Sequence, residues 1–226
     1  MTKQSWNKRS FQASLVLLSV TVVGAAAQGG GMSFFVTSRG LGNGADLGGL
    51  DGADKHCQTL ATAAGAGART WRAYLSADKG DGVLTVNARD RIGKGPWRNA
   101  KGEVIAKDVE QLHGDNNLTK QTALTEKGDV VPGQGDAPNR HDILTGSTAD
   151  GTPYGGVSDR DFSCGKWTKS GDGGPAFALV GHHDRTDLDN SKRGRSWNSA
   201  HLSRGCSQEA LRSTGGDGLF YCFAVD

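Results

Sequence analysis

The chain has 226 residues, of which 35 are glycine; 35% are hydrophobic and 22% are charged. This length suits one domain or two small ones. Glycine at this level without a three-residue period excludes collagen and indicates a fold rich in turns. The chain has only five prolines and many Trp, Phe, Leu and Val residues, a composition that argues against disorder.

The first 27 residues have the pattern of an export signal. Three basic residues stand at the start: Lys3, Lys8 and Arg9. A short apolar run at 11–23 follows, and Ala25-Ala26-Ala27 supplies the small residues that a signal peptidase reads. The alternative is an uncleaved membrane anchor, for which the apolar run is short. We expect cleavage after Ala27, which leaves residues 28–226 as one domain.

The apparent basicity of the chain belongs to this signal. The full chain has 26 Lys and Arg against 24 Asp and Glu, a net charge of +2. Without the three basic residues of the signal, 23 cations face 24 anions and the net charge is −1. A nucleic-acid-binding domain keeps a basic balance in its folded part, so nucleic acid is excluded as a partner. No apolar stretch after the signal reaches the length of a membrane span. We therefore expect a secreted or periplasmic protein with no membrane contact once the signal is cleaved.

Short strands, one helix and long loops are predicted in chain order. Residues 32–38 form a β-rich run, and from Leu50 to Gly65 the apolar residues recur at helical spacing. Further strands are predicted at 70–76, 103–106, 177–180 and 218–225, and one helical turn at 87–92. Residues 113–161 lack periodicity, and loops of this length inside a compact domain are commonly functional. The pattern predicts a single α+β domain.

All four cysteines lie beyond the signal: Cys57, Cys164, Cys206 and Cys222. An even count in an exported chain predicts two disulfides, and three pairings are open. No pair has the C-x-x-C spacing of a zinc or redox site. Disulfide formation by all four would also exclude thiol catalysis.

Several landmarks recur along the chain in a fixed order. Gly52-Ala53-Asp54 precedes Cys57, and WRAYLS follows at 71–76. The later landmarks are Thr145-Gly146-Ser147, Cys164-Gly165-Lys166-Trp167, and Gly205-Cys206 through Leu219-Phe220-Tyr221-Cys222. Their order resembles the endostatin module, which has a C-type-lectin-like fold. The DLGGL-GAD-HCQ opening and the SRGCSQEAL close are similar to those of secreted bacterial proteins named lectins.

This resemblance implies a C-type-lectin-like fold with short twisted strands, one main N-terminal helix and long loops. It implies two nested disulfides, Cys57–Cys222 and Cys164–Cys206. The first would tie the early helix to the last strand, and the second would brace the base of the loops. It also implies a non-catalytic module that binds carbohydrate.

This resemblance makes calcium a candidate cofactor. C-type lectins that bind sugar hold calcium with a Glu-Pro-Asn or Gln-Pro-Asp loop and a Trp-Asn-Asp strand. Here Ala137-Pro138-Asn139 and Trp197-Asn198-Ser199 occur in the same order, with Ala137 and Ser199 in place of two oxygen ligands. Asp136 is adjacent and is the candidate to compensate.

The segment 181–190 is the richest local cluster of metal-binding residue types. It contains His182, His183, Asp184, Asp187 and Asp189. The two histidines with the aspartates would suit zinc, and the three aspartates alone would suit calcium. The endostatin module's zinc ligands lie near its own N-terminus and have no counterpart here, since residues 28–38 contain no His or Asp. The alternative is a polar surface loop in which Asp and Asn make turns.

A sugar-binding face is predicted on the long loops at 115–161 and 181–201. Trp197 is expected to stack on a sugar ring, the alternative being a core position. The predicted ligand-binding residues are Asp136, Asn139, Asp184, Asp187, Trp197 and Asn198. A small basic run of Lys192, Arg193 and Arg195 is only weak support for a heparin-like ligand, given the net charge of −1.

Two other functions remain open. One is a protein-binding or adhesion module that uses the same loops on a cell-surface protein. The other is a metal-dependent hydrolase whose zinc depends on His182 and His183. Ser199 and His201 are two residues apart without a G-x-S-x-G or H-E-x-x-H motif, and the sequence places no partner beside His141-Asp142.

Overall fold

The structure is a computed structural model of the whole chain, and it describes residues 1–3, 31–77, 85–154, 160–172, 174–188 and 191–226. Most of the predicted export signal lies outside these ranges, and so does Asp189. Within the described ranges, no helix is both long enough and apolar enough to cross a membrane.

The elements confirm the predicted α+β class with one main helix. The helices are α1 (Gly49–Ala63), α2 (Val109–His113), α3 (Cys164–Trp167) and α4 (Gln208–Arg212), with a 3₁₀ turn η1 (Ala88–Asp90). The strands are β1 (Phe34–Val36), β2 (Trp71–Ala73), β3 (Trp97–Arg98), β4 (Val104–Ala106), β5 (Asp142–Leu144), β6 (Leu179–His182), β7 (His201–Leu202) and β8 (Gly216–Ala224). The helix α1 ends just before Gly65, as its apolar spacing predicts.

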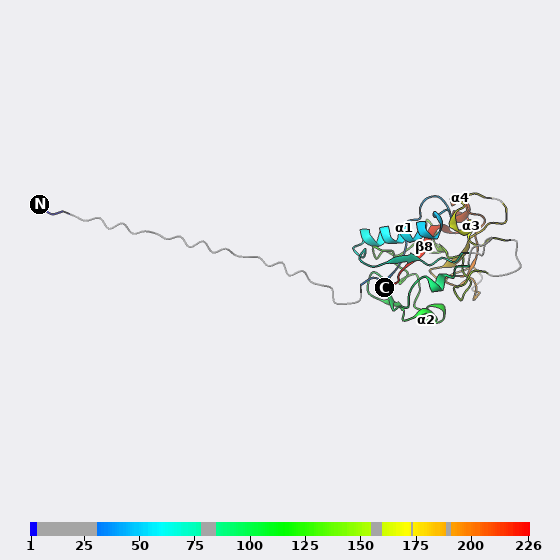
Figure 1. Cartoon of the computed structure of the whole chain (residues 1–226), viewed down its shortest axis with the longest axis horizontal. Coiled ribbons are helices and arrows are strands. Elements are labelled where there is room, and N and C mark those ends of the chain that lie inside the picture. The colour runs from blue at the N-terminus through cyan, green and yellow to red at the C-terminus, as the bar shows by residue number, and fades with distance from the viewer. Residues whose placement is uncertain (4–30, 78–84, 155–159, 173, 189–190) are drawn as a thin grey trace.

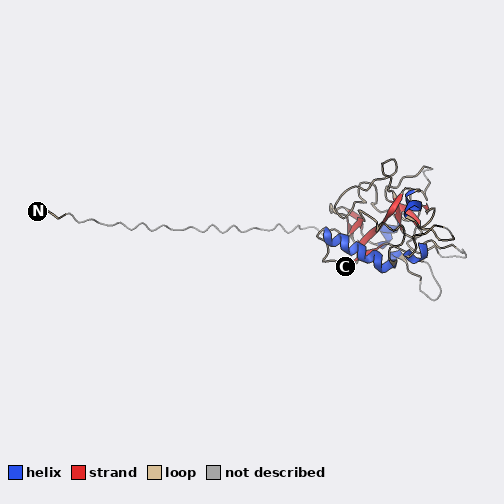
Figure 2. Ribbon diagram, turned by 90° about the horizontal axis from the view of Figure 1, so that it is seen from above, coloured by secondary structure: helices blue, strands red, loops and turns tan. Residues whose placement is uncertain are grey.

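The strand β8 is the centre of a six-stranded sheet with the order β1-β8-β5-β6-β7, and β2 also pairs with β8. It runs antiparallel to β1 and β2 and parallel to β5. The strands β3 and β4 form a separate two-stranded sheet. Figure 1 shows α1 and α4 on one side of β8 and α2 on the other, and Figure 2 shows the long helix beside the strands.

Side chains of β8 alternate between two apolar cores, as the pleat of a strand requires. Phe220 and Cys222 belong to the core under α1. Tyr221 and Phe223 belong to the opposite core, which also contains Trp197. Trp197, in the loop before β7, is therefore anchored on the side of the sheet opposite α1.

Both disulfides pair as the resemblance implies. Cys57–Cys222 joins α1 to β8 with a Cα–Cα distance of 5.6 Å, and Cys164–Cys206 joins α3 to the segment before α4 at 5.8 Å. They close loops of 165 and 42 residues. In the chain-entropy view, loops of this size contribute about 5 and about 4 kcal/mol to stability.

The strand β5 is a correction to the sequence prediction, which left residues 113–161 irregular. Only three residues form it, too few for an alternating pattern to show in the sequence. Its partners β6 and β8 hold it in the middle of the sheet. As a result, the side chain of Asp142 lies in the interior at 2% exposure.

Candidate functional site

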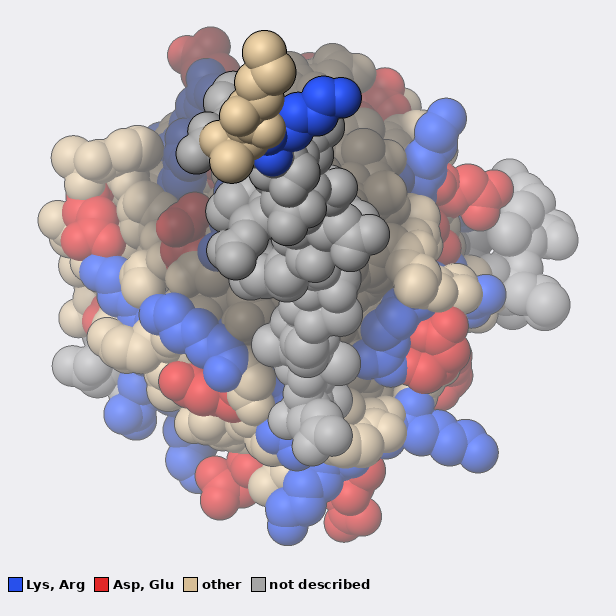
Figure 3. All heavy atoms as spheres, turned by 90° about the vertical axis from the view of Figure 1, so that its left-hand side faces the viewer, with Lys and Arg blue, Asp and Glu red and all other residues tan. Residues whose placement is uncertain are grey.

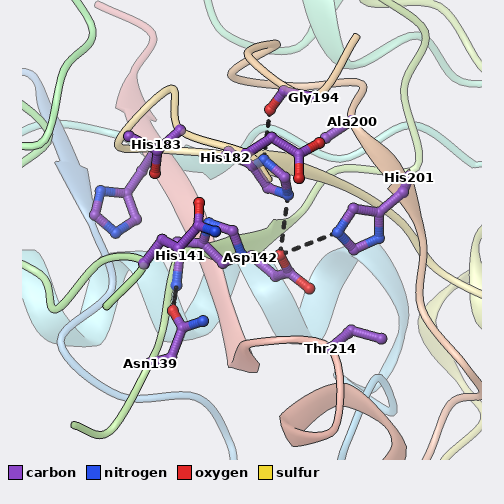
Figure 4. A network of polar contacts seen from close by, with 12 residues as sticks. Asn139, His141, Asp142, His182, His183, Gly194, Ala200, His201 and Thr214 are labelled. Atoms are coloured by element: carbon purple, nitrogen blue, oxygen red, sulfur yellow. Dashed lines mark hydrogen bonds and ion pairs between the residues drawn. The ribbon is translucent and has the colours of Figure 1, made fainter. Parts of the chain in front are cut away.

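The segment 194–201 has a different polar environment on each of its two sides. On one side lies an open groove of about 610 Å³. On the other side the segment closes over a buried cluster of histidines around Asp142 (Figure 4). Both features use residues far apart in the sequence.

The groove is lined by cations, hydroxyl groups and aromatic rings. The residues that give it its character are His113, Tyr154, Arg185, Lys192, Arg193 and Arg195. None of the described residues that line it is Asp or Glu. Among the ion pairs of the described residues, none involves these lysine and arginine side chains. We call this feature the cationic groove.

Backbone and amide oxygens position two of these cations. Arg185 donates from Nε to the Leu118 carbonyl at 2.7 Å and from its guanidinium to the Asn116 side chain at 2.5 Å. Arg193 donates from Nε to the Ala200 carbonyl at 2.9 Å. Because these acceptors are uncharged, the positive charge of each guanidinium is not neutralised.

The protein surface as a whole does not carry charge of a single sign. The face in Figure 3 shows Lys and Arg side chains interspersed with Asp and Glu. Interspersed charges of both signs largely cancel beyond a few ångströms, whereas a groove lined by one sign focuses the field. The charge of the groove is thus a local property of the site.

The structure corrects the role expected of Trp197. Trp197 is 3% exposed, and its ring packs against the rings of Tyr74 and Tyr221 with centroid distances of 4.8 and 5.3 Å. It therefore cannot offer its face to a sugar ring. The exposed aromatic residue at the groove is Tyr154, which is 50% exposed and lies 4.7 Å from the ring of Phe162.

Asn198 is also an internal residue and not an exposed ligand contact. It is 1% exposed, and its amide nitrogen donates to the Tyr74 hydroxyl at 2.9 Å and the Thr148 carbonyl at 3.0 Å. Its amide oxygen accepts from the Ser196 hydroxyl at 3.1 Å. Asn198 holds the floor of the groove in place.

The residues of the expected calcium loop have partners within the chain. The carboxylate of Asp136 lies 2.6 Å from the Lys120 ammonium and accepts the Gly133 N–H at 2.7 Å. The hydrogen bond from Lys120 is the main reason that the pKa of Asp136 lies below its usual value. The side-chain oxygen of Asn139 accepts the His141 N–H at 3.1 Å. The described residues show no polar partner shared by Asn139 and Asn198.

Asp184 supports the histidine cluster from behind. Its carboxylate accepts the Gln134 N–H at 2.7 Å and the Thr186 N–H at 3.2 Å, and it lies 3.5 Å from Nδ1 of His141. Burial raises the pKa of Asp184, but the contact with His141 and these backbone donors outweigh it and hold the pKa well below the usual value.

The expected metal site at Asp184, Asp187 and Asp189 stays a prediction, because the structure describes only two of its three residues. Asp187 accepts the Leu188 N–H at 2.6 Å and lies beside Gly194. Asp189 is outside the described residues. Within the described part, the one group of three metal-binding side chains within ligand reach is His141, Asp142 and His182.

Three imidazoles converge on one carboxylate oxygen at the centre of the cluster. Nε2 of His141, His182 and His201 lies 3.2, 3.2 and 3.4 Å from Oδ1 of Asp142 (Figure 4). Sheet register brings them together, because Asp142 of β5 lies opposite His182 of β6, and β6 in turn pairs with β7, which starts at His201. We call these four residues the histidine–aspartate cluster.

The cluster is closed on three sides and open on the fourth. The side chains of His182, Asp142 and His141 are 0%, 2% and 6% exposed, whereas that of His201 is 36% exposed. Burial raises the pKa of Asp142, but its contacts with His182 and His201 outweigh burial and bring the pKa to about 2. Burial lowers the pKa of His201, and the nearby Asp142 carboxylate raises it above the usual value. Asp142 is therefore a carboxylate at neutral pH.

Only one of the two histidines expected to bind zinc belongs to this cluster. The ring of His183 points away from Asp142 (Figure 4), and its Nε2 contacts the Pro132 carbonyl at 3.3 Å. Burial is the main reason that the pKa of His183 falls to about 4. The sequence analysis weighed His141-Asp142 and His201 only as catalytic candidates and did not place them beside His182; the His-Asp pair just before the apolar residues of β5 was the one signal available.

The comparisons with known proteins leave the function to the site geometry. A scan against protein-family models finds no match, and a search of curated proteins finds no significant relative.

Proposed function

We propose that the chain is an exported carbohydrate-binding module whose cationic groove binds an acidic saccharide. The observation that carries this proposal is the lining of the groove: four Lys and Arg side chains, an exposed tyrosine ring and several hydroxyl groups, with no acidic residue among the described lining residues. Ligand sites typically combine an aromatic wall with a few oriented polar groups. Guanidinium groups suit carboxylates because they donate two parallel hydrogen bonds.

The overall architecture supports a C-type-lectin-like fold within this proposal. One main helix is tied to the last strand by Cys57–Cys222, and Cys164–Cys206 braces the loop-rich half. Disulfides persist in oxidising compartments, which supports a secreted or periplasmic location.

Binding without hydrolysis is the activity that the groove favours. Glycoside hydrolases place two carboxyl groups on either side of the scissile bond. The described lining residues of the groove supply none. The same lack of carboxylates means that sugar binding in the groove would not use calcium.

The test is an array of neutral and acidic glycans probed with the wild-type chain and two variants. The groove variant carries Arg193→Ala and Arg195→Ala, and the control carries Arg72→Ala and Lys101→Ala, two exposed cations outside the groove. We expect binding to acidic glycans that weakens as salt increases, since salt screens exposed charges. The groove variant should lose this binding and the control should keep it.

Equal binding of neutral and acidic glycans, or unchanged binding by the groove variant, would contradict the proposal. If no glycan on the array bound, the alternative of a protein-binding module would replace it, with an acidic protein segment as the expected ligand of the same cations.

A further inference from the structure

The hydrogen bonds of the histidine–aspartate cluster fix which imidazole nitrogens carry protons. Nδ1 of His182 lies 2.5 Å from the Gly194 carbonyl, and Nδ1 of His201 lies 3.0 Å from the Leu202 carbonyl. A carbonyl oxygen only accepts, so each Nδ1 must be the donor. In a neutral ring, Nε2 then has a lone pair, and both of these lone pairs face Oδ1 of Asp142.

His141 is oriented in a similar way, with a carboxylate near Nδ1 but no aligned hydrogen bond to it. Its Nδ1 lies 3.5 Å from Oδ1 of Asp184, and its Nε2 lies 3.2 Å from Oδ1 of Asp142. An imidazole whose Nδ1 faces a carboxylate or carbonyl and whose Nε2 faces inward is the usual arrangement of a histidine that ligates a metal. Three independent strands or strand ends supply this arrangement here.

With the three rings neutral, the centre of the cluster therefore gathers acceptors without donors. Both carboxylate oxygens of Asp142 and Nε2 of His182 are fully buried, and neither residue's inward-facing atoms have an aligned hydrogen-bond partner among the described residues. Buried polar atoms without partners are costly, and a buried charge needs a counter-charge.

Two of the imidazoles also lie face to face beside this carboxylate. The rings of His141 and His182 stack with centroids 4.0 Å apart and an interplanar angle of 18°. A single divalent cation between the acceptors satisfies all of them at once.

We propose that the cluster binds one divalent transition-metal ion, Zn²⁺ above all, through Nε2 of His141, His182 and His201 and the carboxylate of Asp142. Zinc is bound by nitrogen and oxygen ligands in a tetrahedron with bonds of about 2.0–2.1 Å, which has edges of about 3.3–3.4 Å. The contacts of Asp142 Oδ1 with Nε2 of His141 and of His182 measure 3.2 Å each, close to this edge length. Nε2 of His201 lies 3.4 Å from Asp142 Oδ1 but outside the group of three within mutual ligand reach, so its partly exposed ring would move inward to complete the tetrahedron. Calcium is disfavoured because it takes six to eight oxygen ligands.

Two features of the surroundings fit a site that a metal enters from solvent. The half-exposed ring of His201 gives access from outside. On the closed side, a Cβ atom on Gly215 would lie 3.0 Å from Nε2 of His141, so a bare backbone leaves this nitrogen free of a side chain. The site lies across the segment 194–201 from the cationic groove, and its metal would be independent of sugar binding.

The test is metal binding by the full chain without an affinity tag, after removal of metal with a chelator. Titration calorimetry with Zn²⁺ should show one equivalent bound, and Co²⁺ should give the visible absorption of a tetrahedral site. His201→Ala removes a half-exposed ligand and should weaken Zn²⁺ binding by at least about 100-fold, since even residues behind the ligands change affinity by about 10–100-fold. His201→Gln serves as a second variant if the alanine variant does not fold.

Two controls separate this site from other histidines. His56→Ala removes a histidine on α1, and His183→Asn changes the neighbour of His182 whose ring points away from Asp142. Both should bind Zn²⁺ as the wild type does. The proposal is overturned if the wild type binds no Zn²⁺ at micromolar concentration, if folded His201 variants bind it unchanged, or if His183→Asn loses as much affinity as His201→Ala.

Discussion

The two sides of the segment 194–201 satisfy their polar groups in opposite ways. In the cationic groove, positive side chains lie at the surface and form no ion pair with a described carboxylate. In the histidine–aspartate cluster, a buried carboxylate and inward-facing nitrogens have acceptors as neighbours. The groove thus favours binding of an anion from solvent, and the cluster favours binding of a cation in the interior. The difference shows that charge and burial must be read together before a polar residue is assigned a ligand.

The largest expected effect comes from Trp197, which lies in this segment and packs in the core. Replacing a buried tryptophan by alanine costs about 3–5 kcal/mol. Trp197→Ala should therefore lower the free energy of unfolding by that amount in urea denaturation and impair groove and cluster together. Trp197→Phe, which keeps a ring in the core, should cost clearly less. A fully stable Trp197→Ala protein that had lost only glycan binding would restore the stacking role that the sequence suggested.

A second substitution should affect the cluster alone. Asp184→Asn removes the carboxylate behind His141, and we expect Zn²⁺ affinity to fall by about 10–100-fold. Binding of an acidic saccharide should not change, because Asp184 does not line the groove. Asp136→Asn, at a carboxylate paired with Lys120, is the matched control for metal titration. A parallel loss of saccharide binding in Asp184→Asn would show that the two sides are not separable.

A third substitution should affect the groove alone. One exposed charge contributes about 0.5–1 kcal/mol, so Arg195→Ala should weaken binding of an acidic saccharide by about two- to fivefold. The loss should shrink as salt rises, because exposed charges are screened. Titration calorimetry at two salt concentrations measures both effects. A loss independent of salt would indicate that Arg195 acts through packing and not through its charge.

The smallest effect concerns Asp150, which follows Ala149 of the groove lining in the sequence. Its carboxylate accepts hydrogen bonds from the Thr148 and Thr152 hydroxyls, which lower its pKa to about 2. A carboxylate with a lowered pKa stabilises the fold above the usual value near 4, and this stabilisation is lost as pH falls toward 2. Asp150→Asn should therefore cost about 0.5 kcal/mol at pH 7, since the group is largely exposed. The difference from wild type should disappear between pH 4 and pH 2 in denaturation curves.

Local patterns predicted the frame of the fold. The apolar spacing in front of Gly65 gave the main helix, and the β-rich runs gave β1, β2, β4, β6 and β8. The disulfide pairing came only from the likeness to the endostatin module, because four cysteines alone leave three pairings open.

Local patterns could not predict the histidine–aspartate cluster, because the register between strands of the sheet brings its residues together. Nothing local shows that Asp142, His182 and His201 share one point, since β5 is three residues long and pairs with strands that follow it much later. For Trp197 the sequence predicted an exposed ring, because its neighbours in the chain are polar. The ring is buried instead, because Tyr74 and Tyr221 from distant elements enclose it.

The most direct test of the central claim is calorimetric titration of the chain with a uronic-acid oligosaccharide and with a neutral oligosaccharide of the same length. The wild type and His201→Ala should bind the acidic ligand equally and ignore the neutral one. The variant with Arg193→Ala and Arg195→Ala should bind the acidic ligand about 5- to 30-fold more weakly, which corresponds to the loss of two exposed charges at about 0.5–1 kcal/mol each. Equal affinity of that variant and the wild type, or equal binding of both oligosaccharides, would contradict the assignment of the cationic groove as the ligand site.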